Sequence, residues 1–405
     1  MKQPILNILI VCLLPLILCT KASASDDMPY FLNFGNNYFT FKGAFRFPPG
    51  SNEDISRLGN SLGPFTVNHR SNSIYILGHQ QHQAIAEFTI PKLILSNNYK
   101  DLNFSEKIQK FSRILLNKKR LSNPQKIDRI TGMELIEGEL FVNGLLYYDA
   151  AGKATDTTFI IREPTNLKNS KVSGFFELQG KAHSAGWMSK MPASWQQAFD
   201  GSYIVGNANN YPINSRHSIG PTAFISSLDN YAHNTIETGL IRATPLVDYS
   251  LNKPLNKDFY NKHKKNSVWT EMSEAVYGFI PPNSNDYLII GNSGGHESSI
   301  GYKIKPKNAP KCGGPCAYDK NDYYNYFWIY SLNDLLLSKN KKIQPHTVKP
   351  RSYGKITLPY IQKGRLNKIL SADFVDETKQ LFILIGNVDS NEWETTPLML
   401  VYELM

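Results

Sequence analysis

The stretch Leu381–Asp389, LFILIGNVD, contains the unit that organises the chain: an apolar strand followed by glycine and asparagine. The same unit recurs at Ser202–Asn207 (SYIVGN) and Tyr287–Asn292 (YLIIGN). Looser copies occur at Ile74–His79 (IYILGH) and Leu140–Gly144 (LFVNG). Short apolar runs that stop at a glycine are typical of β-strands that end in turns. Five copies in one chain predict a repeat fold.

Each copy is the middle strand of a unit that has the same internal order: an entry strand, the middle strand and an outer strand. The five units span about residues 60–92, 129–164, 183–228, 268–333 and 367–405. No alternation of strands with long helices occurs, which disfavours a doubly wound α/β fold. Repeated small antiparallel sheets that cannot bury both faces alone predict an all-β, five-bladed β-propeller. A β-sandwich built from the same strands is the alternative.

The two ends of the chain are predicted to meet in one blade. Tyr38–Phe47 alternates apolar and polar residues and then stops at a Pro-Pro-Gly turn. We expect this strand to complete the last blade, whose other strands come from the C-terminus, and so to close the ring. The long connections Lys92–Asp128, Leu228–Trp269 and Leu336–Lys368 each have room for a fourth strand.

Two short helices are predicted outside the repeats. Pro192–Gly201 (PASWQQAFDG) has proline at its start and glycine at its end, which frames one to two helical turns. Ser331 and Asp334 have capping-box spacing before a run of leucines, so a second helix is expected to begin there.

The N-terminus has the pattern of a processing segment. Residues 1–24 contain a positive Lys2, an apolar run over Ile5–Leu18 and an Ala-Ser-Ala cleavage site, so we predict a signal peptide followed by one domain over residues 25–405. This predicts a secreted or periplasmic protein. A lipoprotein anchored at Cys19 is the alternative, although Leu18 is bulkier than the residue expected there. No other stretch is long and apolar enough to cross a bilayer.

The chain is basic. It has 44 Lys and Arg against 34 Asp and Glu, and removal of Lys2 and Lys21 with the leader leaves 42 against 34, a balance of +8. Attraction to an anionic surface is one interpretation. The lysines are dispersed over many loops, however, which favours an ordinary basic protein. No nucleic-acid-binding motif accompanies the charge, so no nucleic acid partner is predicted.

Beyond the leader the chain has two cysteines, Cys312 and Cys316, in the sequence CGGPC. Two cysteines this close in an oxidising compartment predict a local disulfide that closes a loop. A metal pair is disfavoured because no second Cys/His pair stands nearby. A redox-active pair would usually be C-x-x-C.

The propeller prediction also places a site. Loops that precede the entry strands and loops that follow the middle strands lie on one face of a propeller, around the central channel. We therefore predict ligand-binding residues at that mouth of the channel: His79, His183, Asn207, Asn292, His296 and Asn387. The competing structural interpretation is that each glycine supplies a positive φ and each asparagine tolerates the left-handed conformation beside it.

Three carboxyl groups lie on or near entry strands of different blades: Glu134, Glu274 and Asp373. A glycoside hydrolase needs two facing carboxyl groups, one as acid and one as nucleophile or base. Glu274 and Asp373 both come early in their strands and form the predicted catalytic pair. The face of Glu134 is not determined by the pattern, and each carboxylate has the alternative of capping loop amides or pairing with a cation.

No metal or particular cofactor is predicted. His79, His82, His183 and His296 fall in mouth loops, but loop histidines are more often solvated or bonded to the backbone than bound to a metal. No P-loop, dinucleotide fingerprint or G-x-S-x-G elbow is present.

Several aromatic and glycine motifs resemble those of secreted bacterial β-propeller proteins. They are Gly186-Trp187 with Met191-Pro192 and Trp195, Gly220-Pro221, and Phe327-Trp328-Ile329-Tyr330 with Asp334-Leu335. The resemblance spans most of the chain after the leader. It implies the fold and export, and no particular activity.

Together these observations predict an exported, monomeric propeller that binds a glycan or another cell-surface ligand at the channel mouth as a scaffold. A glycoside hydrolase that uses the carboxylates is the alternative.

Overall fold

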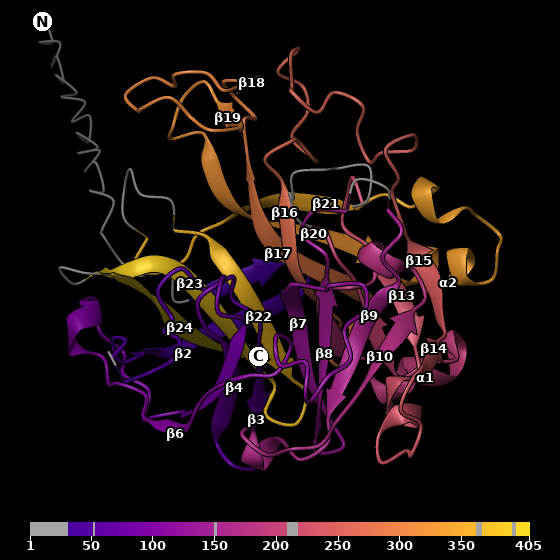
Figure 1. The fold of residues 1–405 in the computed structure, drawn as a ribbon. Helices are drawn as coiled ribbons and strands as arrows, with labels where there is room; N and C mark the ends of the chain where they lie inside the picture. The colour runs from indigo at the N-terminus through magenta and orange to yellow at the C-terminus, as the bar shows by residue number, and fades with distance from the viewer. Residues whose placement is uncertain (1–30, 52, 150–151, 209–217, 362–366, 391–393) are drawn as a thin grey trace, which may run out of the picture.

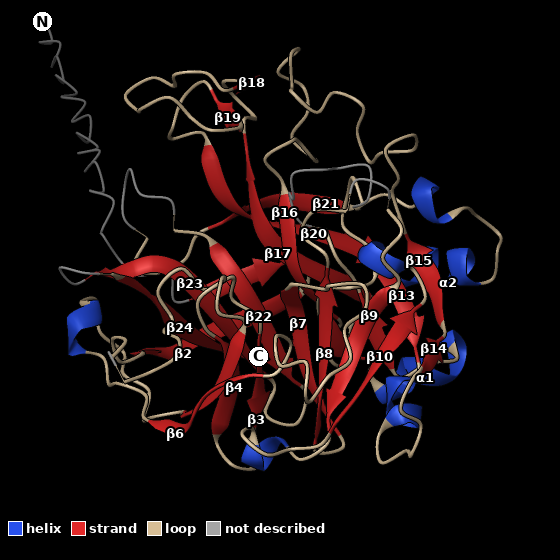
Figure 2. Ribbon diagram, in the orientation of Figure 1, coloured by secondary structure: helices blue, strands red, loops and turns tan. Residues whose placement is uncertain are grey.

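The computed structural model describes residues 31–405, except residues 52, 150–151, 209–217, 362–366 and 391–393. The predicted signal peptide and Cys19 lie outside the described residues. Nearly all regular structure is strand, with a few short helices at the periphery (Figure 2). None of the helices within the described residues is long and apolar enough to cross a membrane.

Five antiparallel sheets form the blades of a propeller, as the sequence predicted (Figure 1). The first blade is β3 (Phe65–Asn68), β4 (Ser73–Leu77), β5 (Ala84–Thr89) and β6 (Lys107–Arg113). The second is β7 (Arg129–Ile136), β8 (Glu139–Leu145), β9 (Asp156–Ile161) and β10 (Val172–Leu178), with β14 (Gly239–Ile241) added parallel to β10. The third is β11 (Met188–Lys190), β12 (Tyr203–Val205), β13 (Ala223–Ser226) and β15 (Ala243–Val247).

The fourth and fifth blades complete the ring. The fourth is β16 (Glu274–Phe279), β17 (Asp286–Gly294), β20 (Tyr323–Ser331) and β21 (Ser352–Ile356). The fifth is β22 (Ile369–Val375), β23 (Gln380–Ser390), β24 (Thr395–Leu404), β2 (Asn37–Arg46) and β1 (Phe31–Phe34). The first strand of each blade contacts the first strands of the neighbouring blades. These five inner strands, which surround the channel, are β3, β7, β11, β16 and β22.

Ring closure occurs as predicted. β2 pairs antiparallel with β24, with Phe39 opposite Leu404 and Arg46 opposite Leu398 (Figure 1). The seam is well packed because Phe39, Phe41 and Phe45 of β2 are all buried. The fourth strands expected in the long connections are β6, β15 and β21, each at a blade edge.

Both predicted helices are present. α1 (Ala193–Phe199) lies between β11 and β12, and the Trp195 indole N–H donates to the Ser284 carbonyl in the next blade, at 3.1 Å. α2 (Leu332–Lys339) begins after Ser331 as expected, but the Ser331 side chain makes no capping hydrogen bond, so the capping-box part of the prediction is wrong.

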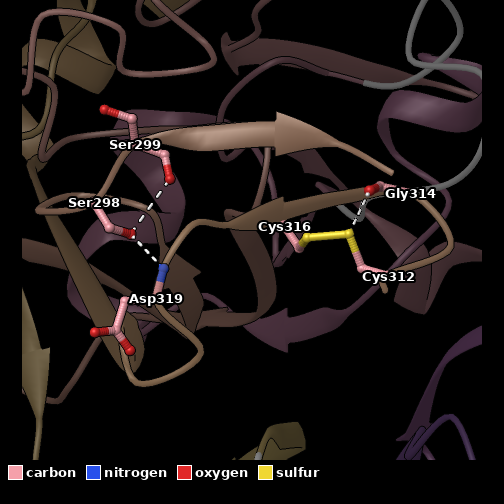
Figure 3. Close-up of a disulfide and its surroundings, with 6 residues drawn as sticks. All are labelled: Ser298, Ser299, Cys312, Gly314, Cys316 and Asp319. Carbon is pink, nitrogen blue, oxygen red and sulfur yellow. Dashed lines mark hydrogen bonds between the residues drawn. A yellow bond between two sulfur atoms is a disulfide. The ribbon is translucent and has the colours of Figure 1, made fainter. Parts of the chain in front are cut away.

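The predicted disulfide between Cys312 and Cys316 is present, with Cα atoms 6.6 Å apart (Figure 3). It closes the tip of an insertion between β17 and β20 that projects beyond the fourth blade and contains the small hairpin of β18 (Ile300–Tyr302) and β19 (Pro315–Ala317) (Figure 1). The Asp319 amide donates to the Ser298 hydroxyl at 3.1 Å and holds the base of the insertion (Figure 3).

Because β24 lies between β2 and β23, deletion of Pro397–Met405 removes the strand that joins the two ends of the chain. We expect this variant to lose cooperative unfolding altogether, which a thermal melt followed by circular dichroism would measure. A matched variant that begins at Asn36 loses only the edge strand β1 and should still melt cooperatively. A sharp melting transition in the C-terminal deletion would contradict the role given to the seam.

Candidate functional site

The end of the channel at which the inner strands begin, here called the entry end, is nearly closed. Within the channel a cavity of about 60 Å³ is lined by Thr131, Asn207, Glu274 and Ser371 among others, and a neighbouring cavity of about 190 Å³ between the first and fifth blades is lined by Lys368 and Asn387 among others. The backbones approach closely: a Cβ atom on Gly132 would overlap the carbonyl oxygen of Gly186. The channel itself therefore has little room for a ligand at its entry end.

The glycines of the repeated units allow a second kind of close approach, between neighbouring segments of the same blade. Gly206 and Gly291 do not have positive φ, so the expectation that glycine supplies a positive φ is wrong at these positions. A Cβ atom on Gly291 would instead overlap the Glu274 carbonyl, and one on Gly206 would lie 2.5 Å from the Trp187 ring. Asn387 does adopt the expected left-handed conformation, with φ 60°.

Two of the predicted asparagines bind the backbone of their surroundings. Asn292 is fully buried; its amide donates to the Ile369 carbonyl at 2.8 Å and its oxygen accepts the Ile369 N–H at 3.0 Å, so it joins the fourth blade to the fifth. Asn207 is buried and donates to the Ala182 carbonyl at 2.7 Å. Asn387 is exposed, and its oxygen accepts the Thr395 hydroxyl at 3.1 Å.

The predicted histidines lie in separate environments. His79 packs on His82, with ring centroids 4.7 Å apart, and His183 hydrogen-bonds Asp248 at 2.5 Å. His296 lies 2.7 Å from the Ser293 hydroxyl, and burial lowers its pKa to about 4, so the ring is neutral at pH 7. The described residues contain no group of three or more metal-ligating side chains.

Glu274 and Asp373 are not brought together. Glu274 begins β16 at the entry end, where its carboxylate pairs with the Lys368 ammonium at 3.2 Å. Lys368 immediately precedes β22, whereas Asp373 is the fifth residue of that strand. Glu274 lines the small entry-end cavity together with Ser371, whereas Asp373 lies two residues further along β22 and lines a different pocket. A role for either residue stays a prediction.

A larger pocket opens at the opposite end of the channel, here called the turn end, where inner strands turn into second strands. Its volume is about 360 Å³. The turns that follow β3, β7 and β22 form its walls, and the channel-facing carboxyl groups of Glu134 and Asp373 line it. The predicted catalytic residue Asp373 therefore faces this pocket, whereas Glu274 lies at the other end of the channel.

Asp373 belongs to a layer of side chains that hydrogen-bond the free edges of neighbouring inner strands. It accepts the Val67 N–H of β3 at 2.7 Å and the Tyr277 hydroxyl at 3.2 Å. Tyr277 in turn accepts the Phe374 N–H at 3.0 Å, and the Thr66 hydroxyl accepts the Leu135 N–H at 3.3 Å. These bonds connect the inner strands to one another across the channel.

Glu134 occupies the corresponding position of β7, two residues before the end of the strand, as Asp373 does in β22. Within the described residues its carboxyl has no hydrogen-bond or ion-pair partner. Burial, with the negative charges of Asp373 and Glu377 as further causes, raises the pKa of Glu134 well above its usual range. The result is a carboxyl that faces the pocket and favours its protonated form.

Asp373 is 3% exposed, and burial raises its pKa to about 6 even though hydrogen bonds from Val67, Tyr277 and Thr66 favour the charged form. The rim carries charges as well. Glu377 lies 3.2 Å from the Lys190 ammonium and 3.9 Å from the His69 ring nitrogen. The pocket thus combines acidic groups at its base with an ion-paired rim.

The sequence pattern leaves the face of Glu134 open, and the structure shows that β7 is irregular. The pairing of β7 with β8 shifts between Ile130 and Gly132, which leaves Thr131 as an extra residue. Such a β-bulge reverses the alternation of faces for every residue that follows. A bulge also interrupts β16 between Ala275 and Tyr277, and β22 between Ile369 and Ser371. The alternation of apolar and polar residues in the sequence does not reveal these bulges, and so it does not reveal which face Glu134 occupies.

No protein-family model matches the chain, and no curated protein sequence matches it. Among solved structures, it is similar to a glycosidase-like protein from Bacteroides thetaiotaomicron, with 11% identity over 89% of this chain and 96% of that chain and a TM-score of 0.42. It is also similar to a glycosyl hydrolase from Bacteroides ovatus, with 10% identity, 90% and 94% coverage and a TM-score of 0.35. At these values the likeness does not bear on this chain's activity.

Asn292→Ala tests whether this asparagine joins blades or serves a ligand. The substitution leaves the Ile369 N–H, the Ile369 carbonyl and the Asn325 amide without their buried partner. We expect a loss of about 2–4 kcal/mol in the free energy of unfolding, measured in urea. The exposed Asn387→Ala should lose less, about 1–2 kcal/mol, because alanine is strained in the left-handed conformation that Asn387 adopts. Equal losses would contradict the assignment.

The raised pKa of Glu134 makes stability depend on pH. A carboxyl whose pKa is higher in the folded state destabilises the fold increasingly as pH rises from its unfolded pKa, about 4.3, towards the folded value. The free energy of unfolding of Glu134→Gln should therefore fall less steeply above about pH 4.3 than that of the wild type, by up to about 1.4 kcal/mol per pH unit. Parallel curves in denaturant titrations at several pH values would contradict this.

Proposed function

We propose that this protein binds a glycan in the turn-end pocket and recognises it through the Glu134 carboxyl. One observation carries the proposal: Glu134 is the member of the channel layer whose carboxyl faces the pocket without a partner among the described residues. Glu134 is half-buried at the pocket wall, where an unpartnered carboxyl is suited to a ligand's hydroxyl groups.

The lining of the pocket supports a ligand that is rich in hydroxyl groups. Carboxylates accept hydrogen bonds from hydroxyls, and the Lys190 ammonium at the rim donates them. Tyr203 and Phe374 add aromatic surface next to these polar groups. A volume of about 360 Å³ falls within the range of roughly 300–1,000 Å³ for small-ligand pockets.

The charge of the pocket narrows the class of glycan. Its acidic lining residues outnumber the basic ones: Glu134, Glu137, Asp373, Asp376 and Glu377 face Arg70 and Lys190, with His69 beside them. Such a lining repels anions. The proposed ligand is therefore a neutral or amino sugar and not a uronate or a sulfated sugar.

A glycoside hydrolase is the second candidate, and the raised pKa of Glu134 favours it. A carboxyl whose pKa is raised holds its proton to higher pH than an ordinary glutamic acid and so is suited to donate it to a leaving group, and a second carboxyl can act as base or nucleophile. In this form of the hypothesis Glu134 replaces Glu274 as the partner of Asp373. Asp373 would then react while held by Val67 and Tyr277.

Binding to a glycan array, followed by calorimetry on the array's strongest ligand, tests the proposal. Loss of hydrogen bonds to a charged or acidic carboxyl should make Glu134→Gln bind roughly 10- to 100-fold more weakly. Glu274→Gln changes a carboxylate at the opposite end of the channel and should bind like the wild type.

Weakened binding by Glu274→Gln alone would overturn the choice of the turn end, and the absence of any glycan ligand would overturn the proposal. Release of reducing sugar by the wild type, lost in Glu134→Gln, would establish the hydrolase instead of a binding scaffold.

A further inference from the structure

The two long insertions next to the fourth blade concentrate positive charge at the entry end. Residues 250–271 precede β16, and residues 295–322 join β17 to β20. Together these 50 residues contain ten lysines and five acidic residues, a net charge of +5 out of the chain's +10. We call the lysines of these two insertions the basic face: Lys253, Lys257, Lys262, Lys264, Lys265, Lys303, Lys305, Lys307, Lys311 and Lys320.

The two insertions are packed against each other, although they are separate in sequence. The Asn261 amide donates to the carbonyls of Gly295 and His296, at 2.9 and 2.7 Å. The Ile300 N–H donates to the Tyr260 carbonyl at 2.9 Å, which joins the base of the disulfide hairpin to the first insertion. Lysines that appear dispersed along the sequence are thereby gathered on one side of the molecule.

The lysines of the basic face are exposed and, among the described residues, none of them forms an ion pair. The nearby acidic groups accept bonds from the backbone. Asp258 accepts the Lys262 N–H at 3.0 Å, and Asp322 accepts the amides of His296, Glu297 and Ser298. The ammonium groups therefore remain available to an external anion.

We propose that the basic face binds an anionic polysaccharide, a chain that carries sulfate, phosphate or carboxylate groups. Exposed tyrosines lie among the lysines: Tyr302 is 59% exposed, with the Lys303 ammonium 5.2 Å from its ring centroid, and Tyr318 is 51% exposed. Aromatic rings beside cations provide a surface for a pyranose ring and a charge for its anionic substituent.

The tip of the hairpin favours a polysaccharide over a membrane. Around the disulfide it consists of Asn308, Ala309, Pro310, Lys311 and a Gly-Gly-Pro turn, without a large apolar side chain to insert between acyl chains. Proteins that lie in a bilayer interface bury such side chains. The disulfide closes residues 312–316, and the Lys303 N–H donates to the Gly314 carbonyl within that loop at 2.9 Å, so Lys303 and the adjacent Lys311 are tied to a restrained segment, which reduces the entropy that binding would cost.

This surface is independent of the turn-end pocket. It lies at the opposite end of the channel and selects the opposite charge. Glu134→Gln is therefore expected to leave binding at the basic face unchanged, so that failure of one proposal is distinguishable from failure of the other.

Titration of the full chain with heparin, polygalacturonate and neutral dextran tests the proposal. We expect the two anionic chains to bind, with affinity falling as salt rises, and dextran not to bind. The triple variant Lys303→Gln, Lys305→Gln, Lys311→Gln should bind roughly tenfold more weakly, because with fewer lysine contacts binding releases fewer counterions from the polysaccharide. Tyr302→Ser should also weaken binding, because it removes an aromatic ring that contacts the sugar. If binding were purely electrostatic, this substitution would have no effect.

A matched triple variant, Lys118→Gln, Lys119→Gln, Lys126→Gln, removes the same charge from exposed positions between the first and second blades. It should bind like the wild type, with both triple variants melting at the wild-type temperature. Equal weakening by the two triple variants would show an effect of net charge and overturn the proposal. Binding to vesicles that contain phosphatidylglycerol, without binding to either anionic chain, would overturn it in favour of a membrane.

Discussion

Every inner strand of this propeller has one edge that pairs with its own blade and one edge that faces the channel. Backbone N–H and C=O groups on the second edge must still be hydrogen-bonded, because leaving them unpaired in a narrow channel is costly. Side chains of neighbouring blades supply the partners. At the entry end Gln83 accepts the Ile130 N–H at 2.6 Å and Asn292 accepts the Ile369 N–H. At the turn end Asp373 accepts the Val67 N–H.

This constraint separates structural from functional polar residues. Asn292 and Asp373 would both be candidates for a site on the grounds of residue type and position alone. Their bonds to the inner-strand edges account for their presence without any ligand, although Asp373 also faces the pocket. Glu134 lies in the same layer and accepts no such bond within the described residues, while burial raises its pKa. Hydrogen bonds to inner-strand edges explain its neighbours Asp373 and Thr66 but not Glu134, which supports the proposed ligand contact.

Much of the fold was predictable because its signals are local. The strand-glycine units, the alternating strand Tyr38–Phe47 and the framed helix Pro192–Gly201 each specify their element within about ten residues. The site was less predictable because it depends on register. The bulge at Thr131 decides which way Glu134 faces, and it arises from backbones that meet only in the folded ring. The position of the basic face was unpredictable for the same reason. Asn261 joins two insertions that are distant in sequence, and this contact brings their lysines together.

The two ends of the channel differ in charge, and this limits what one ligand can do. Acidic residues line the turn-end pocket, whereas the basic face lies at the entry end. Between them the channel is narrow, because Gly132 closely approaches the Gly186 carbonyl of the next blade and a cavity of only about 60 Å³ remains among the first residues of the inner strands. A polyanion that bound the basic face would be repelled by the pocket, and a neutral sugar in the pocket could not pass through the ring. If both proposals hold, the two sites take different ligands, and the basic face would concentrate the protein on an anionic matrix while its pocket faced outward.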